Sequence, residues 1–197
     1  MEFITKIASY TPVPAGGAAV ANCFCMAVAL IYKAVLFETE RNTSPPLIGS
    51  NLAAVKKEIE RLLRDAETLV EEDSEAYLNF VQSRRDGKAL QMKQHFSDII
   101  DVSMKVMEKS ATAFDWVRQL HPLVSPTLQT HLLVASELLM GSINATVHVV
   151  KANLKSIKSE EKKQNYLKRL YDLHRDYHAR YRQIIDSFSE DRNVADA

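Results

Sequence analysis

Hydrophobic residues recur at steps of three and four along most of the chain, which is the period of an α-helix. Between residues 51 and 82 one such face holds Leu52, Val55, Ile59, Leu62, Ala66, Leu69, Ala76 and Phe80. Between residues 159 and 188 another holds Leu167, Leu170, Leu173, Tyr177, Tyr181, Ile184 and Phe188. The sequence contains no alternating strand pattern and no internal repeat. The pattern therefore predicts an all-α protein.

Proline and glycine divide the chain into about six predicted helices, several of them long. We expect them over residues 2–10, 17–40, 51–82 and 88–119, then from the break at 121–126 to about 154, and over 159–188. The third would be on the order of 45 Å long, so a partner subunit is expected to cover its far end. Residues 1–188 are expected to form a single domain, with 189–197 as a flexible tail.

The segment 18–37 is almost entirely apolar and long enough to span a bilayer. Lys33 lies inside it, alanine outnumbers leucine, and no basic cluster flanks it, so we interpret it as a buried helix of a soluble protein. Its late start also argues against a signal peptide. A membrane-embedded helix is the alternative.

Charge and cysteine content restrict the expected partners and the cellular compartment of the protein. The 25 basic and 25 acidic residues cancel, so no overall field favours nucleic acid as a partner. Cys23 and Cys25 are two residues apart and point to different faces of a helix, so they cannot jointly bind a metal or form a disulfide. We interpret them as small core residues in a reducing, cytoplasmic compartment, and we expect no metal site.

A glycine turn precedes the apolar segment. Pro14 fixes the backbone and Gly16 and Gly17 open the helix, whose first N–H groups are free to receive a carboxylate or phosphate. A tight turn needed only for packing is the alternative interpretation.

Two ionisable residues are candidates for chemistry. Asp73 continues the apolar series of its helix, so it is either a buried carboxylate with a structural partner or a ligand-facing acid. His131 begins the fifth helix and is either a structural hydrogen bonder or a group that moves protons near neutral pH. Gly141, Ala145 and Ala152 are expected to let another helix come close.

The last predicted helix mixes aromatic and basic side chains, which is a pattern also seen in proteins that stack nucleic-acid bases. Its tyrosines belong in part to the apolar face, and its acids dilute the positive charge, so we interpret it as an ordinary amphipathic helix. The aromatic and histidine positions are Tyr166, Tyr171, His174, Tyr177, His178 and Tyr181.

Several segments resemble one known family. Residues 11–20, Thr-Pro-Val-Pro-Ala-Gly-Gly-Ala-Ala-Val, are similar to the Thr-Pro-x-Pro-Gly-Gly-Gly-Ser-Val signature of the cyclodeaminase and methenyltetrahydrofolate cyclohydrolase family. Residues 71–77, 133–135 and 152–157 resemble its Asp-x-Asp-Ala-Glu-Ala-Phe, Val-Ala-Ala and Ile-Asn-Leu-x-x-Ile segments, in the same order. Ala15 replaces one glycine and would place a methyl group at the tightest position of the turn. The family's Ser-Asp pair falls on Thr130 and His131, or on Ser125 and Pro126 in a shifted register, and neither supplies an aspartate.

The resemblance implies an all-helical homodimer that opens or closes the methenyl ring of a tetrahydrofolate derivative, with no tightly bound cofactor. Asp73 would hold the cationic ring, His131 would shuttle the proton, and Pro14, Gly16, Gly17 and Asn153 would contact the substrate. The acid, the imidazole and the glycine turn are therefore expected to converge on one pocket.

The resemblance leaves open whether water or ammonia takes part in the reaction. The alternative is a folate-binding or structural dimer with impaired catalysis. A small-molecule folate is the expected ligand, with neither nucleic acid nor membrane as partner.

Overall fold

The computed structural model describes the backbone of residues 2–41 and 46–195 and the side chains of 2–41 and 52–189. This part of the chain forms six α-helices and one short 3-10 helix, with no strand. The helices are α1 (Glu2–Ile7), α2 (Gly16–Glu40), α3 (Pro46–Arg85), α4 (Ala89–Leu120), η1 (His121–Leu123), α5 (Pro126–Leu154) and α6 (Glu160–Ala195). The predicted all-α class is confirmed.

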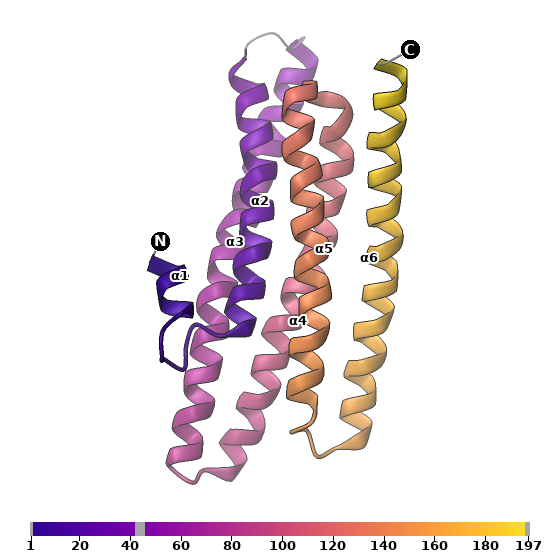
Figure 1. The fold of residues 1–197 in the computed structure, drawn as a ribbon. Helices are drawn as coiled ribbons and strands as arrows, with labels where there is room; N and C mark the ends of the chain where they lie inside the picture. Colours follow the sequence, from indigo (N-terminus) through magenta and orange to yellow (C-terminus); the bar gives the residue numbers. More distant parts are fainter. Residues whose placement is uncertain (1, 42–45, 196–197) are drawn as a thin grey trace.

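Helices α2 to α5 run up and down as a four-helix bundle, as expected when long helices are joined by short connections. Helix α2 packs against both α3 and α5, and α4 closes the opposite side (Figure 1). Helix α6 lies along the outside of the bundle, against α5 and α4. The short α1 stands beside the start of α2.

The core of the bundle is continuous along α2. Ala21, Phe24, Val28 and Ile31 are completely buried between the neighbouring helices. Burial of a side chain such as Phe24 contributes about 1.5–3 kcal/mol. Both α2 and α5 are long and apolar enough to cross a membrane, and the packing of α2 against three helices of the bundle accounts for the apolar residues on its inner side.

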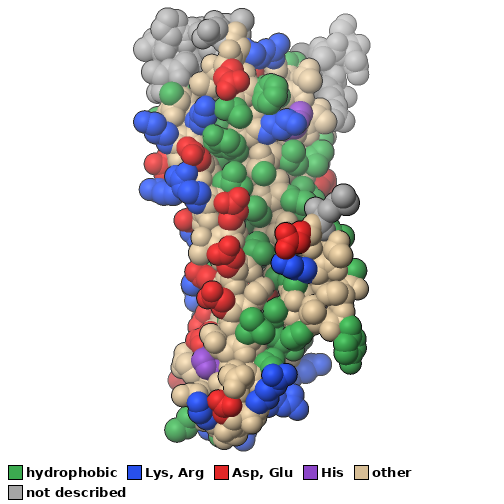
Figure 2. All heavy atoms as spheres, turned by 90° about the vertical axis from the view of Figure 1, so that its left-hand side faces the viewer, with side chains coloured by type: hydrophobic (Ala, Val, Ile, Leu, Met, Phe, Trp, Pro, Cys, Tyr) green, Lys and Arg blue, Asp and Glu red, His purple; other side chains and the backbone are tan. Residues whose placement is uncertain are grey.

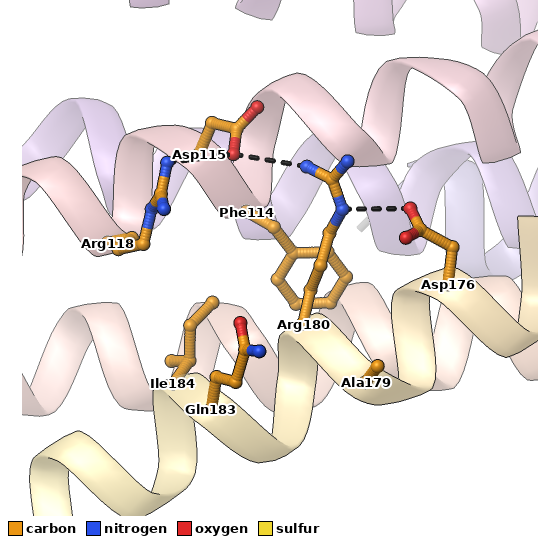
Figure 3. Close-up of a pocket in the computed structure, with 8 residues that line it drawn as sticks. All are labelled: Phe114, Asp115, Arg118, Asp176, Ala179, Arg180, Gln183 and Ile184. Carbon is orange, nitrogen blue, oxygen red and sulfur yellow. Dashed lines mark hydrogen bonds and ion pairs between the residues drawn. The ribbon is translucent and has the colours of Figure 1, made fainter.

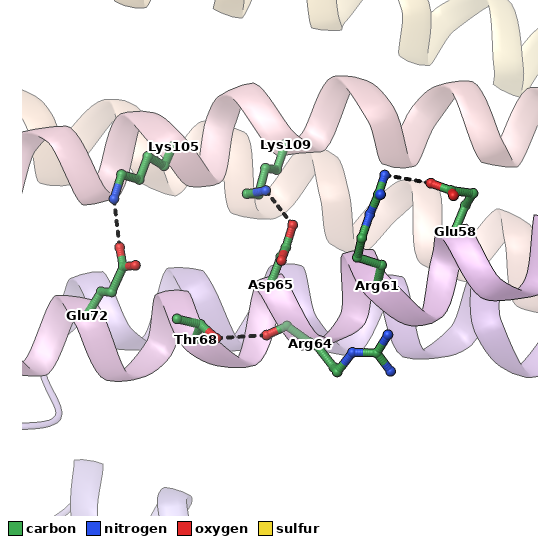
Figure 4. A network of polar contacts seen from close by, with 8 residues as sticks. All are labelled: Glu58, Arg61, Arg64, Asp65, Thr68, Glu72, Lys105 and Lys109. Carbon is green, nitrogen blue, oxygen red and sulfur yellow. Dashed lines mark hydrogen bonds and ion pairs between the residues drawn. The ribbon is translucent and has the colours of Figure 1, made fainter.

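Two ion pairs fix the register between α3 and α4 (Figure 4). Lys105 Nζ lies 2.9 Å from Glu72 Oε2, and Lys109 Nζ lies 2.6 Å from Asp65 Oδ2. All four side chains are partly exposed, so each pair contributes at most about 1 kcal/mol. These ion pairs show which residues of α3 and α4 lie side by side. Lys105 of α4 is level with Asp73 of α3.

Apolar residues at the far end of α3 pack against α4 within the chain. The rings of Phe80 and Phe96 are 4.2 Å apart between centroids, and Ala76 and Ile99 join them in a small separate cluster. Helix α4 therefore covers part of this end, and a partner subunit there stays a prediction.

Two helix boundaries also differ from prediction. Helix α3 begins at Pro46 rather than residue 51, because proline is well tolerated in the first helical turn. Helix α6 continues to Ala195 rather than ending at residue 188, because no proline or glycine interrupts residues 189–195. Residues 42–45, in the predicted loop, and 196–197 lie outside the described part.

Candidate functional site

The start of α2 touches the middle of α3 at one carboxylate. A Cβ atom built on Gly17 would lie 1.9 Å from Asp73 Oδ1 and 2.6 Å from Asp73 Cγ. The Asp73 side chain therefore occupies space that any side chain at residue 17 would need. A glycine is required here because two helices approach closely, as the sequence pattern anticipated.

Asp73 acts as a capping group supplied from another helix. Ala15 is the N-cap residue of α2, and its side chain makes no capping hydrogen bond. The backbone N–H of Ala18, three residues further on, donates to the Asp73 carboxyl group instead. A capping oxygen usually bonds to this amide, and the helix dipole favours negative charge there.

The tightest position of the turn is Gly17, not Ala15 as expected. Ala15 has φ −121° and ψ −160°, an extended conformation that alanine adopts without strain. At Gly16 the nearest atom to an added Cβ would be Val149 Cγ2 at 3.9 Å, an ordinary contact. The replacement of a family glycine by Ala15 is thus compatible with the turn.

Burial changes the acidity of Asp73. The side chain is only 5% exposed, and burial raises its pKa from 3.8 to about 6, against the opposing effect of the hydrogen bond from Ala18. Among the described residues, no lysine, arginine or histidine forms an ion pair with it. A carboxyl group with this pKa can donate or accept a proton close to neutral pH.

His131 does not join Asp73 and Gly17 within the chain. Helices α2 and α5 are antiparallel, with Ser142 Oγ donating to the Val20 carbonyl at 3.1 Å. Val149 is the α5 residue beside Gly16, and His131 precedes it by 18 residues, or about 27 Å along the helix. The predicted convergence of acid, imidazole and glycine turn is therefore wrong for the imidazole. His131 Nδ1 is buried and has no hydrogen-bond partner in the described structure.

The shifted register does not supply an acid either. Ser125 is the N-cap residue of α5, where its N–H donates to Glu38 Oε2 at 3.0 Å and its hydroxyl oxygen accepts from Arg41 at 2.7 Å. Glu38 and Arg41 lie at the opposite end of α2 from Gly17. Ser125 is therefore part of a structural cap.

The remaining predicted site residues lie near the glycine turn. Pro14 is half-buried two residues before Gly16. Asn153 lies one helical turn beyond Val149, and its Nδ2 donates to the Val149 carbonyl at 2.9 Å. The structure thus groups Pro14, Gly16, Gly17, Asp73 and Asn153 at one end of α2 and α5.

A cavity of about 310 Å³ lies further along the same end of the bundle. It is lined by three lysines, three serines and one isoleucine, and by no acidic residue. We call it the lysine pocket; its lining residues are Lys93, Ser97, Ser156, Ile157, Lys158, Ser159 and Lys162. Lys162 Nζ donates to Ser97 Oγ at 2.8 Å. Such a lining suits an anionic ligand.

The position of the lysine pocket follows from the helix registers. Ser97 precedes Lys105, which is level with Asp73, by eight residues, or about 12 Å along α4. Sequence reasoning missed the pocket, because its lysines come from α4, from the α5–α6 connection and from α6. No local spacing connects these three segments.

A larger cavity, of about 480 Å³, opens between α4 and α6 (Figure 3). Arg180 crosses it, with Nη1 3.1 Å from Asp115 Oδ1 and Nε 2.8 Å from Asp176 Oδ2. Its main charges neutralise one another, so it is the weaker candidate for a charged ligand.

Comparison with known proteins identifies the family of the chain and a solved structure with a similar fold. The family model described as formiminotransferase-cyclodeaminase matches residues 1–172. The chain belongs to this family. The crystal structure of formiminotetrahydrofolate cyclodeaminase from Thermotoga maritima has a similar fold, with a TM-score of 0.82 and 20% identity over 93% of this chain and 91% of that one. A search of curated proteins found no significant match.

The formiminotransferase-cyclodeaminase match includes every part of the candidate site. The Gly17–Asp73 contact, Asn153 and all seven residues of the lysine pocket lie within residues 1–172. The family resemblance expected from residues 11–20, 71–77, 133–135 and 152–157 is confirmed.

Proposed function

We propose that the protein converts one-carbon derivatives of tetrahydrofolate, as a cyclodeaminase or cyclohydrolase acting on the formimino- or methenyl-tetrahydrofolate ring. The observation that carries the proposal is the buried carboxyl group of Asp73, which has a pKa of about 6 and lies against the first turn of α2. Membership of the formiminotransferase-cyclodeaminase family supports the substrate class.

Asp73 has the charge and acidity that this chemistry needs. Its carboxylate form would stabilise the cationic methenyl carbon, and its protonated form would supply a proton. If Asp73 activates water for hydrolysis, kcat/KM rises as the pH passes 6. If it protonates departing ammonia, kcat/KM falls over the same range. The pH profile therefore distinguishes the two reactions.

The lysine pocket suits the other end of the ligand. The glutamate tail of a folate is anionic, and Lys93, Lys158 and Lys162 offer ammonium groups without a competing acid in the lining. In this proposal Pro14, Gly16 and Asn153 contact the substrate between Asp73 and the pocket. A tetrahydrofolate derivative is the ligand, and no other cofactor is bound tightly.

We further propose that the protein is a cytoplasmic homodimer that pairs through α2 and α5. Met26 and Phe37 on α2 are each 50% exposed, and Val134 on α5 is 45% exposed. The most apolar stretch of each helix is only 44% buried. Figure 2 shows hydrophobic side chains in a band along the molecule, beside rows of charged ones. An exposed apolar face of this kind is typical of subunit interfaces, and neither membrane nor nucleic acid is needed to account for it.

A folate-binding or structural dimer without turnover is the second candidate. It is favoured by the distance of His131 from Asp73 and by the capping bond that Asp73 already accepts from Ala18. Asp73 would then hold the two helices together and leave any bound ligand unchanged.

One set of assays separates these functions. Turnover is measured with methenyl- and formimino-tetrahydrofolate, and binding of reduced folates by calorimetry. Binding with turnover identifies an enzyme, and binding without turnover identifies a carrier or sensor. A protein that shows neither is structural.

In the enzyme, Asp73→Asn is expected to lower kcat by about 100-fold or more. Glu71→Gln, which changes an exposed acid two residues away, is the control. Equal turnover in Asp73→Asn and wild type would refute the assignment of Asp73.

A further inference from the structure

Two histidines face one another on the outer helix, away from the folate site proposed above. His174 and His178 are four residues apart on α6, and their Nε2 atoms lie 3.2 Å from each other. The rings meet edge to face, with centroids 4.4 Å apart at 72°. Residues at this spacing share one face of a helix, so both imidazoles point to the same place.

A third polar atom reaches this place from α5. Asn144 Oδ1 lies 2.9 Å from His174 Nε2. Possible ligand atoms from two helices therefore lie on either side of His174 Nε2, each within 3.2 Å of it. Both histidines are half-buried and Asn144 is exposed, so solutes can reach them.

The neighbouring surface of α5 is open. Tyr181 donates to Glu137 at 2.6 Å, and with the His174–Asn144 contact this places Gly141 within one residue of the level of His178. Apart from the backbone of its own helix and its chain neighbours, no atom of the described residues lies within 4 Å of the position that a Cβ of Gly141 would occupy. The close helix contact predicted for Gly141 is not formed by the described residues, so the space beside the histidine pair is open in the single chain.

The two facing Nε2 atoms can both offer lone pairs to a cation. Neutral imidazole is the form that binds metals, with its proton on one nitrogen and a lone pair on the other. Without an ion, His174 Nε2–H donates to Asn144 Oδ1 or to His178 Nε2; an ion that takes the place of this proton would bind the lone pairs of the same atoms.

We propose that His174, His178 and Asn144 form a binding site for a divalent transition-metal ion of the zinc type, which links α5 to α6. Zn–N bonds are about 2.0–2.1 Å long, which puts two nitrogens of a tetrahedral site about 3.3–3.4 Å apart. The observed separation of 3.2 Å lies within reach of that value without a change of backbone.

The ion would take two nitrogens, one amide oxygen and water. Among the described residues, no group of three or more His, Cys, Asp or Glu side chains could hold a metal. The site therefore depends on the amide of Asn144 and on solvent, and we expect exchangeable binding. Imidazole nitrogens favour Zn²⁺ and Cu²⁺ over Mg²⁺.

The test is titration of the full-length protein, free of any purification tag, with Zn²⁺ alone. We expect saturable binding of one ion per chain by calorimetry and a rise of a few degrees in Tm, because the ion joins two helices. His174→Gln and His178→Gln should each weaken binding at least tenfold and abolish the rise in Tm. His95→Gln, which changes a half-buried histidine on α4 beside Asp98, is the matched control and should bind as wild type does.

A second measurement locates the ion in the unmodified protein. Co²⁺ in place of Zn²⁺ should broaden the NMR signals of the His174 and His178 rings first, and its spectrum should lack thiolate charge-transfer bands from Cys23 or Cys25. Absence of saturable Zn²⁺ binding, unchanged affinity in both histidine variants, or thiolate bands would each overturn the proposal.

Discussion

Gly17 and Asp73 restrict one another, because the carboxyl group fills the volume of the missing side chain. In Gly17→Ala the new methyl group would lie 1.9 Å from Asp73 Oδ1, so α2 or Asp73 must move. We expect a loss of about 1–3 kcal/mol in the free energy of unfolding, together with loss of turnover in the enzyme. Urea unfolding measures the change in the free energy of unfolding. Gly16→Ala is the control and should be nearly neutral, since its nearest neighbour would be 3.9 Å away. Equal stability of the two variants would contradict the contact.

Asp73 also makes the stability of the protein depend on pH. Its pKa is raised to about 6 in the folded chain, so between pH 3.8 and 6 the unfolded chain loses this proton while the folded chain keeps it. The folded state is therefore penalised as the pH rises through this window, by on the order of 3 kcal/mol once the pH exceeds 6.

The Asp73→Asn variant removes this penalty and still offers an oxygen to the Ala18 amide. We expect it to match wild type near pH 4 and to be more stable at pH 7, by up to the same amount. Urea unfolding at pH 4, 5, 6 and 7 measures the difference. A difference that does not change with pH would show that Asp73 is not buried as an acid.

The two candidate residues show which parts of a site a sequence reveals. Asp73 was predicted to face the interior because it continues the apolar series of its own helix, and periodicity is a local property. The place of His131 depends on the register between α2 and α5. That register is set by contacts such as Ser142 with Val20, between residues far apart in the chain. Local spacing carries no information on such contacts.

At the scale of elements, the number and type of helices followed from the sequence, and their ends followed less well. The breaks at Gly87 and Pro122 were correctly placed, because these residues cannot continue a helix at low cost. The start of α3 at Pro46 and the extension of α6 to Ala195 were missed, since proline is accepted in a first turn and polarity alone does not end a helix.

The lysine pocket yields a prediction at this scale, because it is assembled from three elements. We expect Lys158→Ala and Lys162→Ala to raise KM for a folate substrate about fivefold or more with little change in kcat, since they remove uniform binding of the anionic tail. The effect should shrink at high salt. Lys155→Ala removes an exposed lysine of the same segment that does not line the pocket. A KM unaffected in both pocket variants would place the tail elsewhere.

At the scale of the molecule, the apolar character of α2 has two causes. One side of the helix fills the bundle core, which accounts for Phe24, Val28 and Ile31. The other side leaves Met26 and Phe37 half exposed, and Val134 on the adjacent helix α5 is 45% exposed. The sequence indicated a partner subunit from the length of α3, but α4 covers part of that helix. The exposed α2 and α5 residues are therefore the better place for a second copy.

Charge introduced on this face tests the dimer. We expect Met26→Glu and Val134→Asp to reduce the mass in solution from two chains to one, because an unpaired charge buried in an interface costs several kcal/mol. Light scattering coupled to size exclusion measures the mass. Leu90→Glu changes an apolar residue that is 81% exposed on α4, outside this face, and should leave the mass unchanged. Dimers that persist in both face variants, or a wild-type protein of single-chain mass, would show that α2 and α5 do not pair copies.

Because α2 also carries the glycine turn, an interface on this helix would couple assembly to the position of Asp73. The monomeric variants should then lose turnover as well.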